Sequence, residues 1–193
     1  MYYKVCGLIL RFFMLFIFRI KYVGRNNMPS DGGCILAVNH RHNWDPIIAA
    51  LASPRQLTFM AKAELFKNPV FGRLIKSLGA FPINRNSGDV GAVKSAFKIL
   101  KENRVMLIFP QGHRIKDGSK GKTRAGMVRV AQMCKVPIIP MYISGEYRWM
   151  NKITVTIGEP IYLTEYYGKK LSEEELNNIK DDIIDIMWSY KVD

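Results

Sequence analysis

The sequence lacks the patterns of a disulfide scaffold, a metal centre, a repeat protein or a membrane-spanning helix. Its three cysteines, Cys6, Cys34 and Cys134, are odd in number and do not have the spacing of metal ligands. We therefore expect a reduced, cytosol-facing protein that holds no metal. The apolar run of residues 5–18 contains Arg11 and is shorter than the roughly 20 residues of a transmembrane helix. No small-residue cleavage site follows it, which argues against a removed signal peptide.

The charge of the chain is strongly positive and unevenly distributed. The net charge is +13, yet residues 159–193 carry four basic against nine acidic side chains, so the rest of the chain is more basic still. A basic body indicates an anionic partner, which can be nucleic acid, an anionic membrane or a phosphorylated substrate. The aromatic residues gather in the apolar N-terminal run and not among the basic residues, which argues against a nucleic-acid partner.

The first 21 residues read as a helix that lies in a membrane interface. On a helical wheel Lys4, Arg11 and Arg19 fall on one narrow stripe, and the rest of the surface is apolar. A buried core helix or an oligomer interface is the alternative. The pattern predicts a peripheral or monotopic protein at the cytoplasmic face of the cell membrane, with residues 22–193 forming a single domain.

That domain alternates short apolar strands with amphipathic helices. Strands are predicted near residues 34–38, 57–61, 81–84, 105–109, 136–143 and 153–157. The helix that begins at Pro69 is expected to bury one apolar face, made of Val70, Phe71, Leu74, Ile75 and Leu78. The alternation predicts an α/β fold with a mixed, mostly parallel sheet flanked by helices.

A histidine and an aspartate lie close together where the strand at 34–38 gives way to a helix. His40 follows the strand, and Asp45 precedes Pro46 at the helix entrance. One interpretation is that Asp45 is simply the N-cap of the helix and that His40, like many single histidines in loops, is structural. The sharper interpretation is a pair in which the imidazole accepts a proton from a hydroxyl and the carboxylate steadies the imidazole. No serine or cysteine is obviously paired with His40, so the hydroxyl would belong to the substrate.

Four blocks in order resemble the lysophosphatidic acid acyltransferase family. Residues 38–46 contain the pattern N-H-x-x-x-x-D-P, and residues 109–114 contain F-P-x-G-x-R. Between them, residues 79–85 are similar to the family's glycerol-phosphate-binding segment, and residues 136–140 match a proline-bracketed strand. Each block alone is a weak signal, and the ordered set is specific.

The resemblance implies a glycerol-phosphate acyltransferase-like fold and assigns the site. The catalytic residues would be His40 as base and Asp45 as its partner. Substrate binding would fall to Arg85, Gln111, Gly112, Arg114, Lys62 and Lys122. A solvated surface position remains an equally good explanation for Lys62 and Lys122. The reaction would acylate lysophosphatidate to phosphatidate from acyl-coenzyme A or acyl carrier protein, without a cofactor.

The chain departs from the family pattern at three positions. His42 stands where serine is usual, Gln111 where glutamate is usual, and His113 where threonine is usual. Glutamine keeps the size and hydrogen-bonding ability of glutamate but loses its charge. Two alternatives therefore stay open, an acyltransferase for another lysolipid and a non-catalytic, membrane-bound lipid-binding homologue.

Overall fold

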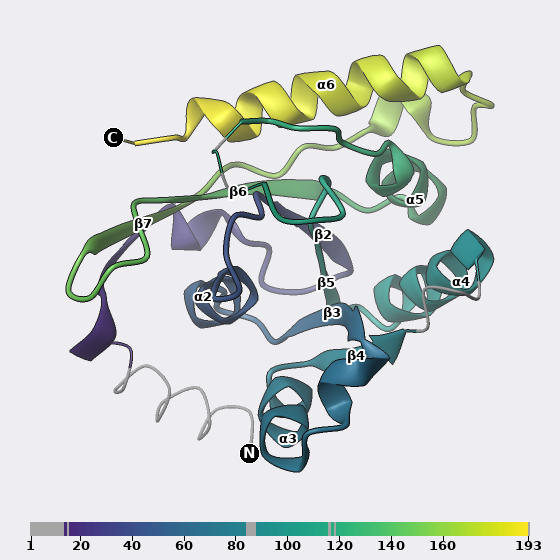
Figure 1. Ribbon diagram of the computed structural model, residues 1–193. Helices are drawn as coiled ribbons and strands as arrows, with labels where there is room; N and C mark the ends of the chain where they lie inside the picture. The colour runs from purple at the N-terminus through teal and green to yellow at the C-terminus, as the bar shows by residue number, and fades with distance from the viewer. Residues whose placement is uncertain (1–13, 15, 84–87, 116, 118, 193) are drawn as a thin grey trace.

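The computed structural model describes residues 14, 16–83, 88–115, 117 and 119–192, apart from the side chains of residues 62, 83, 88–90 and 92. A seven-stranded sheet in the order β1-β7-β6-β2-β5-β3-β4 forms its centre, and helices cover both faces (Figure 1). All neighbouring strands are parallel except β6 and β7, which are antiparallel. The predicted mixed, mostly parallel sheet flanked by helices is confirmed.

The elements follow the predicted alternation. The strands are β1 (Arg19–Val23), β2 (Cys34–Val38), β3 (Leu57–Lys62), β4 (Ala80–Ile83), β5 (Val105–Ile108), β6 (Ile138–Ser144) and β7 (Lys152–Ile157). The α-helices are α2 (Asp45–Ala52), α3 (Pro69–Ser77), α4 (Gly88–Lys101), α5 (Gly126–Cys134) and α6 (Glu173–Ser189). Short 3-10 helices are η1 (Arg25–Asn27), η2 (Ala63–Phe66) and η4 (Thr164–Tyr166).

Two apolar cores lie on opposite faces of the sheet. Alternate residues of β2 point to opposite sides, so Leu36 packs in the core with α2 and α3, and Ile35 packs in the core with α4, α5 and α6. All five residues of β2 are buried, as expected for a central strand covered on both faces. The loops that follow β2, β3, β5 and β6 meet at one edge of the sheet because these strands are parallel.

The N-terminal boundary differs from the prediction. Residues 14, 16 and 17 are helical, but β1 begins at Arg19 and pairs with β7, so residues 19–21 belong to the sheet and not to the helix. The rest of the predicted interface helix, residues 1–13 and 15, lies outside the described residues. Within the described part of the chain, every helix is too short or too polar to cross a bilayer.

Helix α3 buries less of its apolar face than its sequence predicts. Ile75 and Leu78 are buried, whereas Val70 is 79% exposed and Phe71 is 40% exposed. The reason lies in the position of α3, which packs against η2 and β4, the last strand of the sheet. At such an edge the neighbours cover only a narrow side of the helix.

Candidate active site

The loop between β2 and α2 brings His40 and Asp45 into direct contact. His40 Nδ1 lies 2.9 Å from Asp45 Oδ2, and the Asp45 side chain is only 1% exposed. Because the carboxylate can only accept, a neutral imidazole donates from Nδ1 and keeps the lone pair on Nε2. Nε2 makes no hydrogen bond to the residues that the structure describes. The geometry therefore suits a general base.

Asp45 is not the N-cap of α2. Trp44 occupies the cap position and makes no side-chain hydrogen bond there, while Asp45 is the first helical residue and is followed by Pro46. Its carboxylate turns back into the preceding loop, where Oδ2 also accepts hydrogen bonds from the backbone N–H groups of Arg41 and His42, both at 2.6 Å. One oxygen thus holds both the imidazole and the loop that carries it.

Tyr147, which follows β6, is a member of this site that the sequence analysis missed. Its hydroxyl donates a hydrogen bond to Asp45 Oδ1, and its ring stacks on His42 at a centroid distance of 4.4 Å. Burial raises the pKa of Tyr147 far above its usual range, and the charge of Asp45 adds to the effect. The hydroxyl therefore remains a donor at any working pH. The signal in the sequence was its position shortly after the predicted strand at residues 136–143.

His40 is fixed on its remaining sides by the segment after β5. The imidazole, 17% exposed, stacks on the Phe109 ring at a centroid distance of 4.0 Å. The backbone N–H of His40 donates to Gln111 Oε1 at 2.7 Å, and its carbonyl accepts from the Ile115 N–H at 2.8 Å. Both main-chain polar groups of His40 are thus committed to this segment.

Gln111 has both ends of its side chain occupied within the protein. Its Oε1 accepts from His40, and its Nε2 donates to the Lys120 carbonyl at 3.2 Å. The residue is 2% exposed. In this arrangement Gln111 braces the loop and does not offer a group to substrate, which differs from its assignment in the sequence analysis. A glutamate could accept from His40 but could not donate to Lys120.

Gly112 and Arg114 have different surroundings. Gly112 has φ +69°, a left-handed conformation that favours glycine, and its N–H donates to the Phe109 carbonyl at 2.9 Å. It therefore shapes a turn and has no free N–H for a substrate. Arg114 is exposed, and its guanidinium donates to the Asn43 side chain in the loop that carries His40 and Asp45. Among the predicted anion-binding side chains that the structure describes, Arg114 is the one with a defined contact there.

The other predicted substrate contacts are only partly described. Lys62 is the last residue of β3 and so lies at the same edge of the sheet as His40, but its side chain is outside the described part. Arg85 lies outside the described residues altogether. Lys122 is exposed and comes shortly before α5, and it forms no ion pair with the described residues.

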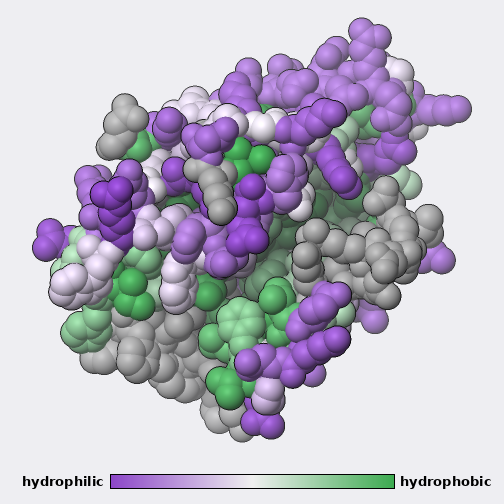
Figure 2. Space-filling view, in the orientation of Figure 1, coloured by the Kyte–Doolittle hydropathy of each residue, from purple (hydrophilic) through white to green (hydrophobic). Residues whose placement is uncertain are grey.

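An apolar groove begins beside Phe109 and has a volume of about 450 Å³. Apolar side chains from β3, β5 and α5 line it, among them Met60, Ile108, Met127 and Val130. Three charged residues, Arg124, Arg129 and Glu173, also line it, and Arg129 forms an ion pair with Glu173. Figure 2 shows this hollow, with green walls, near the middle of the face in view. It can take an extended aliphatic chain next to Phe109, the ring on which His40 stacks.

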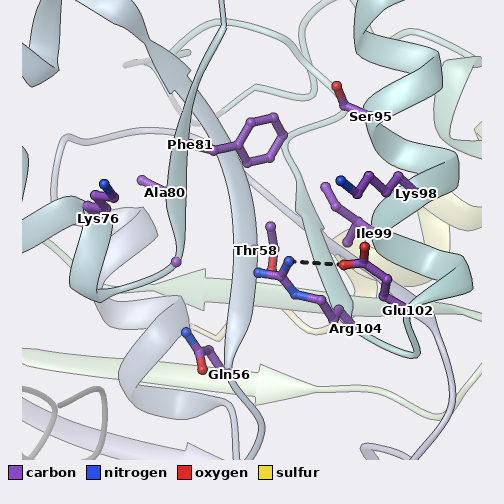
Figure 3. A pocket seen from close by; sticks show the side chains of 11 residues that line it. Gln56, Thr58, Lys76, Ala80, Phe81, Ser95, Lys98, Ile99, Glu102 and Arg104 are labelled. Atoms are coloured by element: carbon purple, nitrogen blue, oxygen red, sulfur yellow. Dashed lines mark hydrogen bonds and ion pairs between the residues drawn. The ribbon is translucent and has the colours of Figure 1, made fainter.

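A second cavity, of about 300 Å³, contains none of the predicted site residues (Figure 3). Gln56, Thr58 and Arg104 place it at the amino edge of the sheet, opposite His40. Its basic side chains Lys76 and Lys98 lie in the last turns of α3 and α4, where cations offset the helix dipoles. The favourable interaction of these two cations with the helix C-termini therefore explains their charges without a ligand.

Comparison with known proteins gives one consistent answer. The family model described as "Acyltransferase" matches residues 19–144. A 1-acyl-sn-glycerol-3-phosphate acyltransferase of Bacillus subtilis (strain 168) is 32% identical over 170 residues, covering 85% of this chain and 84% of that protein. One of Streptococcus pneumoniae is 34% identical over 170 residues, covering 84% of this chain and 62% of that protein.

A solved structure has the same fold. The crystal structure of PlsC, the 1-acyl-sn-glycerophosphate acyltransferase of Thermotoga maritima, superposes with a TM-score of 0.72. The match covers 95% of this chain and 77% of that one, at 24% sequence identity. It supports the sheet order and the helix placement described above.

Proposed function

This chain belongs to the acyltransferase family and is an enzyme related to 1-acyl-sn-glycerol-3-phosphate acyltransferases, and from that premise we propose that it acylates lysophosphatidate to phosphatidate. The observation that carries the proposal is the buried Asp45 carboxylate on Nδ1 of His40, which leaves Nε2 for a substrate proton. The acyl donor is a thioester of coenzyme A or of acyl carrier protein.

The reaction follows from this geometry. His40 Nε2 removes the proton of the free glycerol hydroxyl, and the hydroxyl oxygen attacks the thioester carbonyl carbon. A new C–O bond forms and the C–S bond breaks. The thiolate that leaves takes the proton from the imidazolium, which restores neutral His40. Asp45 holds the ring in the correct tautomer and stabilises its charged form.

The basic residues at this edge bind the phosphate of the acceptor. Arg114 is exposed beside Asn43, and its guanidinium can form paired hydrogen bonds to phosphate oxygens. On the family resemblance, Arg85, Lys62 and Lys122 are further candidates for this role. Holding the phosphate places the hydroxyl at Nε2, and positioning of this kind can lower a barrier by about 7 kcal/mol.

The apolar groove beside Phe109 receives the acyl chain of the donor. Its walls are aliphatic and thioether side chains, and it begins at the ring on which His40 stacks. Arg124, which also lines it, would face the phosphates of coenzyme A or an acidic carrier protein, whereas Arg129 is already paired with Glu173. Both substrates carry long apolar chains, so the enzyme works at a membrane surface, peripheral or monotopic on the cytoplasmic side.

The test measures thiol release from acyl-coenzyme A in the presence of lysophosphatidate and other lysolipids. H40A and D45N should each lower turnover at least about 100-fold while remaining folded, because the base or its orienting charge is lost. H113A, at an exposed position of the same segment, is the matched control and should keep its activity.

Near-wild-type turnover by folded H40A would exclude the base assignment. Turnover with another lysolipid but not with lysophosphatidate would change the acceptor. No turnover with any acceptor or donor would favour a non-catalytic lipid-binding homologue.

A further inference from the structure

Three large apolar side chains are exposed together on η2 and the first turn of α3. Leu65 is 42% exposed, Val70 is 79% exposed and Phe71 is 40% exposed. The two elements are in contact, since a Cβ at Gly72 would lie 2.9 Å from the Phe66 carbonyl oxygen. Figure 2 shows green side chains over this part of the molecule. Single exposed apolar residues are common, but a group on adjoining elements indicates an interaction surface.

Basic side chains accompany this group. Lys67 is exposed in the linker between the two elements and Arg73 is exposed on α3, against one exposed acid, Glu64. No salt bridge joins either cation to an acidic side chain within the described chain. Apolar side chains accompanied by cations complement an anionic lipid surface, because the apolar groups enter the headgroup region and the cations stay among the phosphates. We call these five residues, Leu65, Lys67, Val70, Phe71 and Arg73, the η2–α3 face.

The η2–α3 face is not needed for the folded core. The buried side of α3 is supplied by Gly72 and Ile75, and the side chain of Asn68 already caps the helix by accepting from two backbone N–H groups. Val70 is left almost uncovered by the described residues and Phe71 is covered only in part, although water exposure of such side chains is unfavourable. A contact beyond the described residues accounts for them.

We propose that the η2–α3 face docks on the surface of an anionic lipid bilayer. Helix η2 directly follows the carboxyl end of β3, the edge at which the catalytic pair lies, so docking there brings the bilayer to the side from which an acceptor enters. The proposal rests on the proposed function only in taking the bilayer as the source of the lysolipid acceptor. The contact itself depends on the exposed residues of η2, α3 and the linker between them.

The test is sedimentation of the full chain with vesicles of phosphatidylcholine alone or mixed with phosphatidylglycerol. V70S/F71S should reduce the partition coefficient about tenfold or more in both mixtures, because two apolar side chains no longer enter the lipid. K67A/R73A should reduce it about tenfold with phosphatidylglycerol and little without it, because each cation interacts with the anionic surface.

The matched control is M133S/I186S. Met133 is 56% exposed on α5 and Ile186 is 40% exposed on α6, far from α3 in the fold (Figure 1). This double variant loses comparable exposed apolar surface and should bind vesicles like the wild type. All three variants should unfold at the wild-type temperature, since the changed side chains are exposed.

Wild-type partition of V70S/F71S in both lipid mixtures overturns the proposal. The proposal would also be overturned if the wild type without lipid self-associated, with a mass that rises with concentration, and V70S/F71S did not. The face would then be an interface between copies of the chain. Activity toward a short-chain, water-soluble lysophosphatidate separates the two proposals. If V70S/F71S keeps this activity but loses vesicle binding, the docking face is supported. If the wild type has no activity but still binds vesicles through this face, only the proposed function is contradicted.

Discussion

Tyr147 and Asp45 are 102 residues apart in sequence, and the tyrosine hydroxyl donates to the one carboxylate oxygen that His40 does not use. The carboxylate is thereby held from two sides. Oδ2 receives the imidazole and two backbone N–H groups, and Oδ1 receives the phenol. A carboxylate so fixed can orient an imidazole without rotating away from it.

Removing this hydroxyl should lower turnover without unfolding the protein. We expect Y147F to reduce kcat about tenfold, in the range typical of groups that orient a reactive residue, with little change in the KM of either substrate. The phenyl ring can keep its contacts with His42 and Phe18. The control is Y142F, because the Tyr142 hydroxyl is buried without a hydrogen-bond partner among the described residues, so its loss should cost no stability. Equal kcat for Y147F and wild type would contradict a positioning role.

Gln111 should not tolerate the glutamate that is usual in the family pattern. Q111E keeps an acceptor for the His40 N–H but loses the donor to the Lys120 carbonyl and introduces a charge at a position that is 2% exposed. We expect a loss of about 2 kcal/mol in the free energy of unfolding and faster trypsin cleavage after Lys120. Urea unfolding and timed proteolysis measure the two effects. Stability equal to or above the wild type would show that the amide is not required.

Arg114 should act on the acceptor and not on the donor. R114A is expected to raise the KM for lysophosphatidate about tenfold and to leave the KM for the thioester unchanged, because a charge-assisted hydrogen bond to phosphate is lost. R114K should recover only part of the effect, since an ammonium cannot form the paired hydrogen bonds. R104A, at the opposite edge of the sheet, is the control. An unchanged acceptor KM in R114A would remove Arg114 from the phosphate site.

Cys34 should make the protein less stable in alkali. Burial raises the pKa of its thiol to about 11, and Arg55 offsets part of this effect. Because the pKa is higher in the folded state, the thiol contributes its full stabilisation at pH values below the pKa of the unfolded chain. This contribution is lost as the pH rises through the pKa of the folded protein. The free energy of unfolding should therefore fall by on the order of 2 kcal/mol between about pH 9 and pH 11.

The comparison that checks this prediction is C34A against wild type by urea unfolding across that pH range. C34A should have a flatter pH dependence, whatever its stability at neutral pH. C134A is the control, because Cys134 is only half-buried and its pKa is raised less. Parallel curves for C34A and wild type would mean that the thiol does not couple to folding.

The sequence could predict what depends on local pattern. Continuous apolar runs such as residues 34–38 indicated central strands, and the spacing of His40 and Asp45 across one strand–helix junction predicted their contact. The placement of Arg114 near that junction came from the resemblance of residues 109–114 to the family pattern, and the structure confirms it, because β5 and β2 are parallel neighbours and their loops meet.

What the sequence could not predict depends on which surfaces meet. Tyr147 reaches Asp45 only because β6 lies beside β2, a neighbour relation that no local pattern contains. Gln111 was placed in the correct loop, but its partners are main-chain groups that come together in the folded chain. The apolar periodicity of α3 was correct, yet its position at the last strand leaves Val70 and Phe71 uncovered.

The double attachment of His40 to residues 111 and 115 has a consequence for redesign. The main chain of the histidine is held by a segment of fixed length, so one residue inserted between these two positions would shift the imidazole relative to Asp45. The side chains of Lys122 and Arg124 carry no such constraint, although the main chain of Arg124 also bonds to this segment. A library that randomises those two side chains while preserving the spacing can therefore vary the charge nearby and leave the contact between His40 and Asp45 unchanged.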